Sequence, residues 1–117
     1  MLPYKRNQRV GDLIRMEVSE IILARMKDPR IGFVTVTEVQ LTEDLKSARI
    51  YVSVLRKEQE EETLGALRKA TGFIRREAAK NVHLKYMPDL EFYVDNSIDY
   101  GARIDTILKQ IKEGEDK

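Results

Sequence analysis

An amphipathic helical pattern between Leu64 and Val82 constrains the fold of this chain more than any other feature. Apolar or small residues recur there at helical spacing, whereas lysines and arginines occupy the other faces. The apolar stripe comprises Leu64, Leu67, Thr71, Ile74, Ala78 and Val82, and the basic set comprises Arg68, Lys69, Arg75, Arg76 and Lys80. Ala70-Thr71-Gly72 interrupts the pattern, and a glycine inside a helix costs roughly 1 kcal/mol relative to alanine. Because the stripe stays in phase through Gly72, we expect one bent helix rather than two independent helices.

Length and composition indicate one ordinary domain. The chain has 117 residues, too few for a second core of usual size, and we expect a single domain over residues 1–112 with a short charged tail at 113–117. Cysteine is absent and His83 is the single histidine, so neither a disulfide nor the usual zinc site can form. No apolar run approaches the roughly 20 residues that cross a bilayer. We expect a cytoplasmic protein without a metal or cofactor.

The flanking patterns predict a first helix and a pair of strands. Apolar residues at helical spacing predict a helix that runs to about Lys27 and ends at Asp28-Pro29, because proline lacks an N–H and restricts the residue before it. Alternating β-branched residues predict strands at 33–39 and 48–55. The apolar phase of the first strand shifts between Val36 and Val39, which indicates a bulge.

A third strand and a last helix complete the pattern. Residues 90–94 alternate between apolar and polar side chains, and Asn96 or Ser97 can cap a helix after them. The inward-facing residues of that helix would be Ile104, Ile107, Leu108 and Ile111. The predicted order is therefore helix, strand, strand, kinked helix, strand, helix. Three strands covered on one face by helices make a two-layer α+β domain.

The charges are segregated along the chain although the formal net charge is only +1. Residues 1–30 carry 7 basic and 4 acidic groups, and residues 65–85 carry 6 and 1. The intervening segment 31–64 has 4 basic and 7 acidic groups, and residues 86–117 have 4 and 8. Two positive and two negative segments suit a protein with one side that faces phosphate.

Nucleic-acid phosphate is thus the leading candidate ligand, because arginine and lysine match phosphate oxygens in charge and geometry. The candidate contacts are Lys5, Arg6, Arg9, Lys27, Arg30, Arg68, Lys69, Arg75, Arg76, Lys80 and Lys85. Three alternatives remain open. The bent helix can simply expose a solvated charged face. Lys5, Arg6 and Arg9 can belong to a disordered start, and Lys27 can stabilise a helix terminus.

Several other residues have two readings. Gly72 can let another part of the protein pack closely or let an RNA backbone approach. Phe73 is expected to pack rather than to stack on a base, and Tyr51 and Tyr93 are expected to be half-buried in their strands. Glu17 interrupts the apolar face of the first helix and has no evident role.

The order of elements resembles the type II arrangement of KH RNA-binding domains, and four motifs narrow the resemblance further. They are Lys27-Asp28-Pro29-Arg30-Ile31, Val39-Gln40-Leu41-Thr42-Glu43-Asp44-Leu45, Ala48-Arg49-Ile50-Tyr51-Val52-Ser53 and Pro88-Asp89-Leu90-Glu91-Phe92. In this order and spacing they resemble the ribosome-binding factor A family, from about Arg6 to Ile111. KH domains clamp RNA with a Gly-x-x-Gly loop. This chain has Ala70-Thr71-Gly72 instead, which matches the family's Ala-x-Gly interruption and implies a kinked helix in place of the open loop.

The resemblance implies a non-enzymatic ribosome assembly factor. Such a factor would bind the free small ribosomal subunit near its rRNA during late maturation and rRNA processing, and it would matter for growth in the cold. The chain has no phosphate-binding loop of the Walker type, no cysteine nucleophile and no His-Glu-x-x-His motif, which disfavours an enzyme. We expect a monomer. The alternative is a protein–protein adaptor whose acidic segments dock on ribosomal proteins or other assembly factors.

Overall fold

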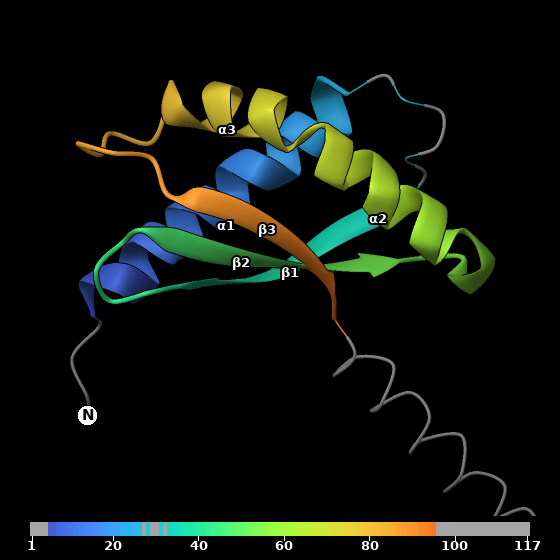
Figure 1. Ribbon diagram of the computed structural model, residues 1–117, viewed down its shortest axis with the longest axis horizontal. Coiled ribbons are helices and arrows are strands. Elements are labelled where there is room, and N and C mark those ends of the chain that lie inside the picture. Colours follow the sequence, from blue (N-terminus) through green and yellow to red (C-terminus); the bar gives the residue numbers. More distant parts are fainter. Residues whose placement is uncertain (1–4, 27, 29–30, 32, 96–117) are drawn as a thin grey trace, which may run out of the picture.

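The computed structural model describes residues 5–26, 28, 31 and 33–95, and its elements follow the predicted order (Figure 1). In chain order they are α1 (Arg6–Ala24), β1 (Val34–Leu41), β2 (Ser47–Val54), the short 3-10 helix η1 (Lys57–Gln59), α2 (Glu60–Lys69), α3 (Thr71–Ala79) and β3 (Asp89–Val94). The predicted last helix, the predicted tail at 113–117, and Lys27 and Arg30 lie outside the described residues.

The three strands form one mixed sheet in the order β1-β2-β3. β1 pairs with β2 in antiparallel fashion, and β2 pairs with β3 in parallel fashion. The parallel pair needs a long crossover, which the bent helix supplies. The register of the first pair shifts between Val36 and Glu38, so the predicted bulge is confirmed. The extra residue is Thr37, whose hydroxyl donates to Asp95 Oδ2 at 2.5 Å across β2.

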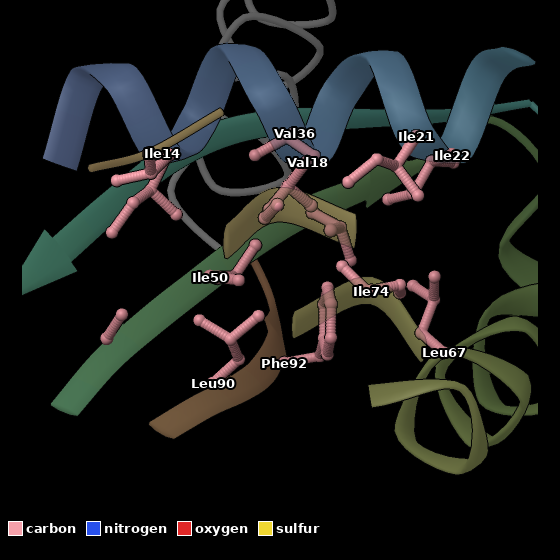
Figure 2. Close-up of a cluster of buried hydrophobic side chains, with 14 of the residues drawn as sticks. Ile14, Val18, Ile21, Ile22, Val36, Ile50, Leu67, Ile74, Leu90 and Phe92 are labelled. Atoms are coloured by element: carbon pink, nitrogen blue, oxygen red, sulfur yellow. The ribbon is translucent and has the colours of Figure 1, made fainter. Parts of the chain in front are cut away.

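The helices cover one face of the sheet and leave the other face polar. Figure 2 shows the α1 side chains Ile14, Val18 and Ile21 directed toward the sheet, with Leu67 of α2 and Ile74 of α3 beside Phe92 of β3. The predicted apolar stripe of the bent helix therefore faces the core, and it is buried at Leu67, Ile74, Ala78 and Val82. Phe73 packs against this core as expected. The two-layer α+β architecture follows from this burial.

The bent helix turns at Ala70, within the predicted interruption. Ala70 has φ −91° and ψ 4°, between α2 and α3. Its N–H still donates to the carbonyls of Ala66 and Leu67, both at 3.1 Å, and its carbonyl accepts from the Ile74 N–H at 2.9 Å. The Thr71 hydroxyl also donates to the Leu67 carbonyl, at 3.2 Å. Backbone hydrogen bonding thus continues through a change of direction, as predicted.

Gly72 does not allow close packing inside the protein. A methyl group added there would meet no atom within 4 Å, and none of the described glycines has a positive φ. Gly72 therefore admits no neighbouring segment from the part of the chain that the structure describes.

The first helix ends earlier than predicted, at Ala24 rather than near Lys27. The N–H groups of Arg25 and Met26 both donate to the Ile21 carbonyl, at 2.9 and 3.2 Å, so a capping turn uses the residues that would have continued the helix.

Polar contacts tie α1 to α3. The Glu17 carboxylate accepts from Asn81 Nδ2 at 3.0 Å, which gives this residue the role that its sequence position left open. Arg25 Nη1 lies 3.9 Å from the Glu77 carboxylate. These contacts fix the helical layer on which the candidate site is built.

Candidate nucleic-acid interface

Two of the predicted phosphate-binding arginines have main-chain partners in the folded protein. Arg68 Nη2 donates to the Phe92 carbonyl at 3.2 Å. Arg75 donates from Nε to the Pro88 carbonyl at 3.0 Å and from Nη2 to the Met87 carbonyl at 2.5 Å. Arg68 thus attaches α2 to β3, and Arg75 attaches α3 to the two residues that precede β3.

Another predicted contact, Lys80, is held by an acidic neighbour. Its ammonium forms an ion pair with Glu77, three residues earlier on the helix. The hydrogen bond from Lys80 is the main reason that the pKa of Glu77 lies below its usual value, with smaller contributions from Arg25 and Arg76. The carboxylate therefore stays ionised and offsets the charge of Lys80 near neutral pH.

The remaining cations of the bent helix form an exposed ridge. Lys69, Gly72 and Arg76 are all exposed; Lys69 is the last residue of α2, and Gly72 and Arg76 lie four residues apart on one face of α3. We call these three residues the helix ridge. Lys69 and Arg76 make no hydrogen bond or ion pair with the part of the chain that the structure describes. The ridge presents two available cations on either side of an open glycine.

A second group of cations meets at one end of the sheet, in a hollow of about 370 Å3. Three segments that are far apart in sequence line it: the start of α1, the turn between β1 and β2, and the loop after α3, which lie at the same end of the molecule in Figure 1. Its lining residues are Arg6, Asp44, Leu45, Lys46, Leu84, Lys85, Tyr86, Met87 and Asp89. We call this site the end hollow. Arg6, Lys46 and Lys85 give it three exposed cations.

The turn between β1 and β2 is held by local hydrogen bonds. Asp44 Oδ1 accepts from the Thr42 hydroxyl at 2.6 Å and from the Lys46 N–H at 3.1 Å. These two bonds, in that order, keep the pKa of Asp44 below its usual value. Leu45 has φ +62°, a left-handed conformation that is costly for a residue with a side chain. The conformation lets Leu45 pack against the core while Lys46 stays exposed.

The loop after α3 contributes an aromatic side chain to the end hollow. Tyr86 is 76% exposed. Lys85 Nζ lies over its ring at 5.7 Å from the ring centre, a cation–π arrangement. The Asp89 N–H donates to the Lys46 carbonyl at 2.9 Å, which joins this loop to the turn between β1 and β2.

The structure distributes the other predicted contacts unevenly. Arg6 and Lys85 come together in the end hollow, 79 positions apart in sequence. Lys5 Nζ lies 3.9 Å from Glu43, and both side chains are well exposed, so this ion pair is weak. Arg9 is exposed on α1. Lys27 and Arg30 are outside the described residues.

Sequence reasoning missed Lys46 and Tyr86. Lys46 stands in an acidic segment and Tyr86 stands beside a proline turn, so neither belongs to a recognisable pattern. The one available signal was the turn sequence Thr42-Glu43-Asp44, which places the next exposed side chain at the end of the sheet. Of the two strand tyrosines, Tyr51 is half-buried as predicted and Tyr93 is 36% exposed, and their ring centres lie 5.9 Å apart.

The described residues contain no cluster of three or more acidic or histidine side chains that could hold a metal ion. None of the helices in the described part of the chain is long and apolar enough to cross a membrane. The arrangement of cations, an aromatic ring and apolar residues in the end hollow is suited to binding a ligand that has both phosphate and flat apolar surfaces.

Comparison with known proteins gives one consistent result. The sequence model of the ribosome-binding factor A family matches residues 6–108. Ribosome-binding factor A of Thermodesulfovibrio yellowstonii is 51% identical over 113 residues, which are 97% of this chain and 96% of that protein.

Solved structures agree with the sequence comparison. The crystal structure of ribosome-binding factor A from Thermus thermophilus is similar with a TM-score of 0.70 at 29% identity, over 77% of this chain and 97% of that one. A homology model of the Thermus thermophilus factor, fitted into the cryo-EM map of a 30S complex, is similar with a TM-score of 0.63 at 30% identity, over 74% of this chain and 91% of that one. The predicted KH-like fold is confirmed, and the chain belongs to the ribosome-binding factor A family.

Proposed function

We propose that this chain is a non-enzymatic, cytoplasmic assembly factor that binds the free small ribosomal subunit through its rRNA. Membership of the ribosome-binding factor A family supports the proposal, as does the relative whose coordinates were fitted into a 30S complex. The observation that carries the rRNA contact is the convergence of Arg6, Lys46 and Lys85 from three distant segments on the end hollow. The helix ridge supplies a second group of phosphate-binding cations.

The mechanism is differential affinity for two arrangements of rRNA. A protein that binds the immature arrangement more tightly than the mature one favours the former until the subunit rearranges and the binding site is lost. Such a factor assists late rRNA processing and maturation without forming or breaking a covalent bond. Since RNA misfolding is harder to reverse at low temperature, its absence should slow growth most in the cold.

Co-sedimentation with purified small subunits over a series of salt concentrations tests this proposal. Lys46→Glu should weaken binding, and each phosphate contact that is lost should make the slope of log K against log salt shallower by about 0.7 to 0.9. Arg56→Glu is a matched control, because Arg56 is also exposed and follows β2 at the opposite end of the sheet. Both variants change a surface charge and should keep the wild-type unfolding temperature.

The outcome also separates rRNA binding from the adaptor alternative. Glu61 and Glu62 are exposed in the first turn of α2, where their charges already complement the helix dipole. If Glu61→Lys and Glu62→Lys abolish co-sedimentation while Lys46→Glu does not, the adaptor hypothesis replaces the rRNA hypothesis. Chemical footprinting of the subunit with and without the protein should then show no protected rRNA.

A further inference from the structure

We propose that the end hollow takes a single unpaired nucleotide of the RNA, with its base stacked on Tyr86 and its phosphate held by Arg6, Lys46 and Lys85. This inference rests on the proposed function and specifies the kind of RNA element that the site recognises. It concerns the hollow alone and leaves the helix ridge as a simple phosphate contact.

The lining of the end hollow is the first argument. A surface that contacts only the phosphates of a duplex needs cations and gains nothing from apolar residues. The end hollow instead combines its three cations with the half-buried apolar side chains Leu45, Leu84 and Met87. An apolar floor beside cations fits a ligand that carries a flat base next to a phosphate.

The position of Tyr86 is the second argument. Its side chain is 76% exposed although it lines the hollow, so the folded protein gains little from burying the ring. The Lys85 ammonium lies over one face of the ring at 5.7 Å from its centre, so a base would stack on the opposite face with this cation close by for its phosphate. RNA-binding proteins stack unpaired bases on such exposed aromatic rings.

Two carboxylates in the hollow argue against a duplex backbone. Asp44 and Asp89 lie among the cations, and hydrogen bonds from Thr42 and Lys46 keep Asp44 ionised. Closely packed phosphates would be repelled by them. A single nucleotide offers hydrogen-bond donors as well, from its base edge and its ribose 2′-hydroxyl, and carboxylates accept these bonds.

Binding of short RNA to the full chain tests the inference. The probe is a single-stranded RNA decamer with 2-aminopurine at its centre, and the comparison is the same strand annealed to its complement. The wild-type protein should prefer the single strand and quench 2-aminopurine fluorescence. Tyr86→Leu should weaken single-strand binding by about 5- to 100-fold and remove the quenching, whereas Tyr86→Phe should retain both.

Phe33→Leu is the matched control, because Phe33 is 80% exposed and precedes β1 at the opposite end of the sheet. It should bind RNA like the wild type. The inference is overturned if Tyr86→Leu binds the single strand as well as the wild type does, if duplex RNA binds equally well, or if Phe33→Leu causes the same loss. Should Lys46→Glu still weaken subunit binding in that event, the proposed function stands and only the unpaired-nucleotide reading fails.

Discussion

Arg75 and Arg76 are adjacent residues of one type on one helix, and the structure places them in different environments. Arg75 donates two hydrogen bonds to the Pro88 and Met87 carbonyls, whereas Arg76 is exposed and makes no hydrogen bond or ion pair with the described residues. Replacing each in turn by alanine removes the same side chain from two environments. We expect Arg75→Ala to destabilise the fold and Arg76→Ala to weaken RNA binding.

The magnitude for Arg75→Ala follows from its two bonds. A hydrogen bond from a charged donor contributes about 1.5 to 3 kcal/mol, and an acceptor left buried without a partner adds to the loss. Pro88 is fully buried, but Met87 is only half-buried, so water can replace one of the two bonds. We therefore expect a loss of about 2 to 4 kcal/mol in the free energy of unfolding. For a chain of 117 residues this corresponds to a fall of roughly 8 to 16 °C in Tm.

Urea unfolding followed by circular dichroism measures the first effect, and subunit co-sedimentation over a salt series measures the second. Arg76→Ala should stay within about 0.5 kcal/mol of the wild type in stability, while its salt slope becomes shallower by about 0.7 to 0.9. Arg75→Lys, which keeps the charge but loses the two-pronged donor geometry, should recover about half of the lost stability. Equal stabilities for the two alanine variants, or a larger loss for Arg76→Ala, would refute the assignment of roles.

Two further predictions concern the helix glycines and the turn between β1 and β2. Gly72→Ala should raise the free energy of unfolding by about 0.5 to 1 kcal/mol, because its methyl group meets no atom within 4 Å. Gly11→Ala should lower the free energy of unfolding by about 1 kcal/mol or more, because the methyl group would lie 3.1 Å from the Val39 carbonyl oxygen in β1. Thermal unfolding of the Gly72→Ala and Gly11→Ala variants checks these opposite effects. Asp44→Ala should lower the urea midpoint at pH 7, but its difference from the wild type should shrink as the pH falls below about 4. The pKa of Asp44 is lowered in the folded state, so its ionised form stabilises the protein at pH values above the unfolded-state pKa. This contribution is lost as the pH falls through the folded-state pKa. A difference in urea midpoint between Asp44→Ala and the wild type that does not change with pH contradicts this interpretation.

Local patterns were sufficient to predict most of the fold. The buried stripe of the bent helix, the bulge after Val36 and the kink at Ala70-Thr71-Gly72 all depend on residues a few positions apart, so their periodicity is visible in the chain itself. The end of α1 was placed too late because the proline signal marks where a helix must have ended. Proline at position 29 limits how far the helix can extend, but it gives no sign of the turn at Arg25 and Met26 that ends the helix earlier.

The sequence by itself thus determined the order of helices and strands from α1 to β3, the face that each buries and the excess of positive charge on two segments. Only the tertiary structure decided which of those charges remain available to a ligand. Arg68 and Arg75 bind carbonyls of the β3 segment that are distant in sequence, and Lys46 joins Arg6 in the end hollow only because the sheet brings its turn to the start of α1. The physical reason is that burial patterns are set by neighbours along the chain, whereas the partner of a long, flexible, charged side chain is set by whichever distant segment the fold places beside it.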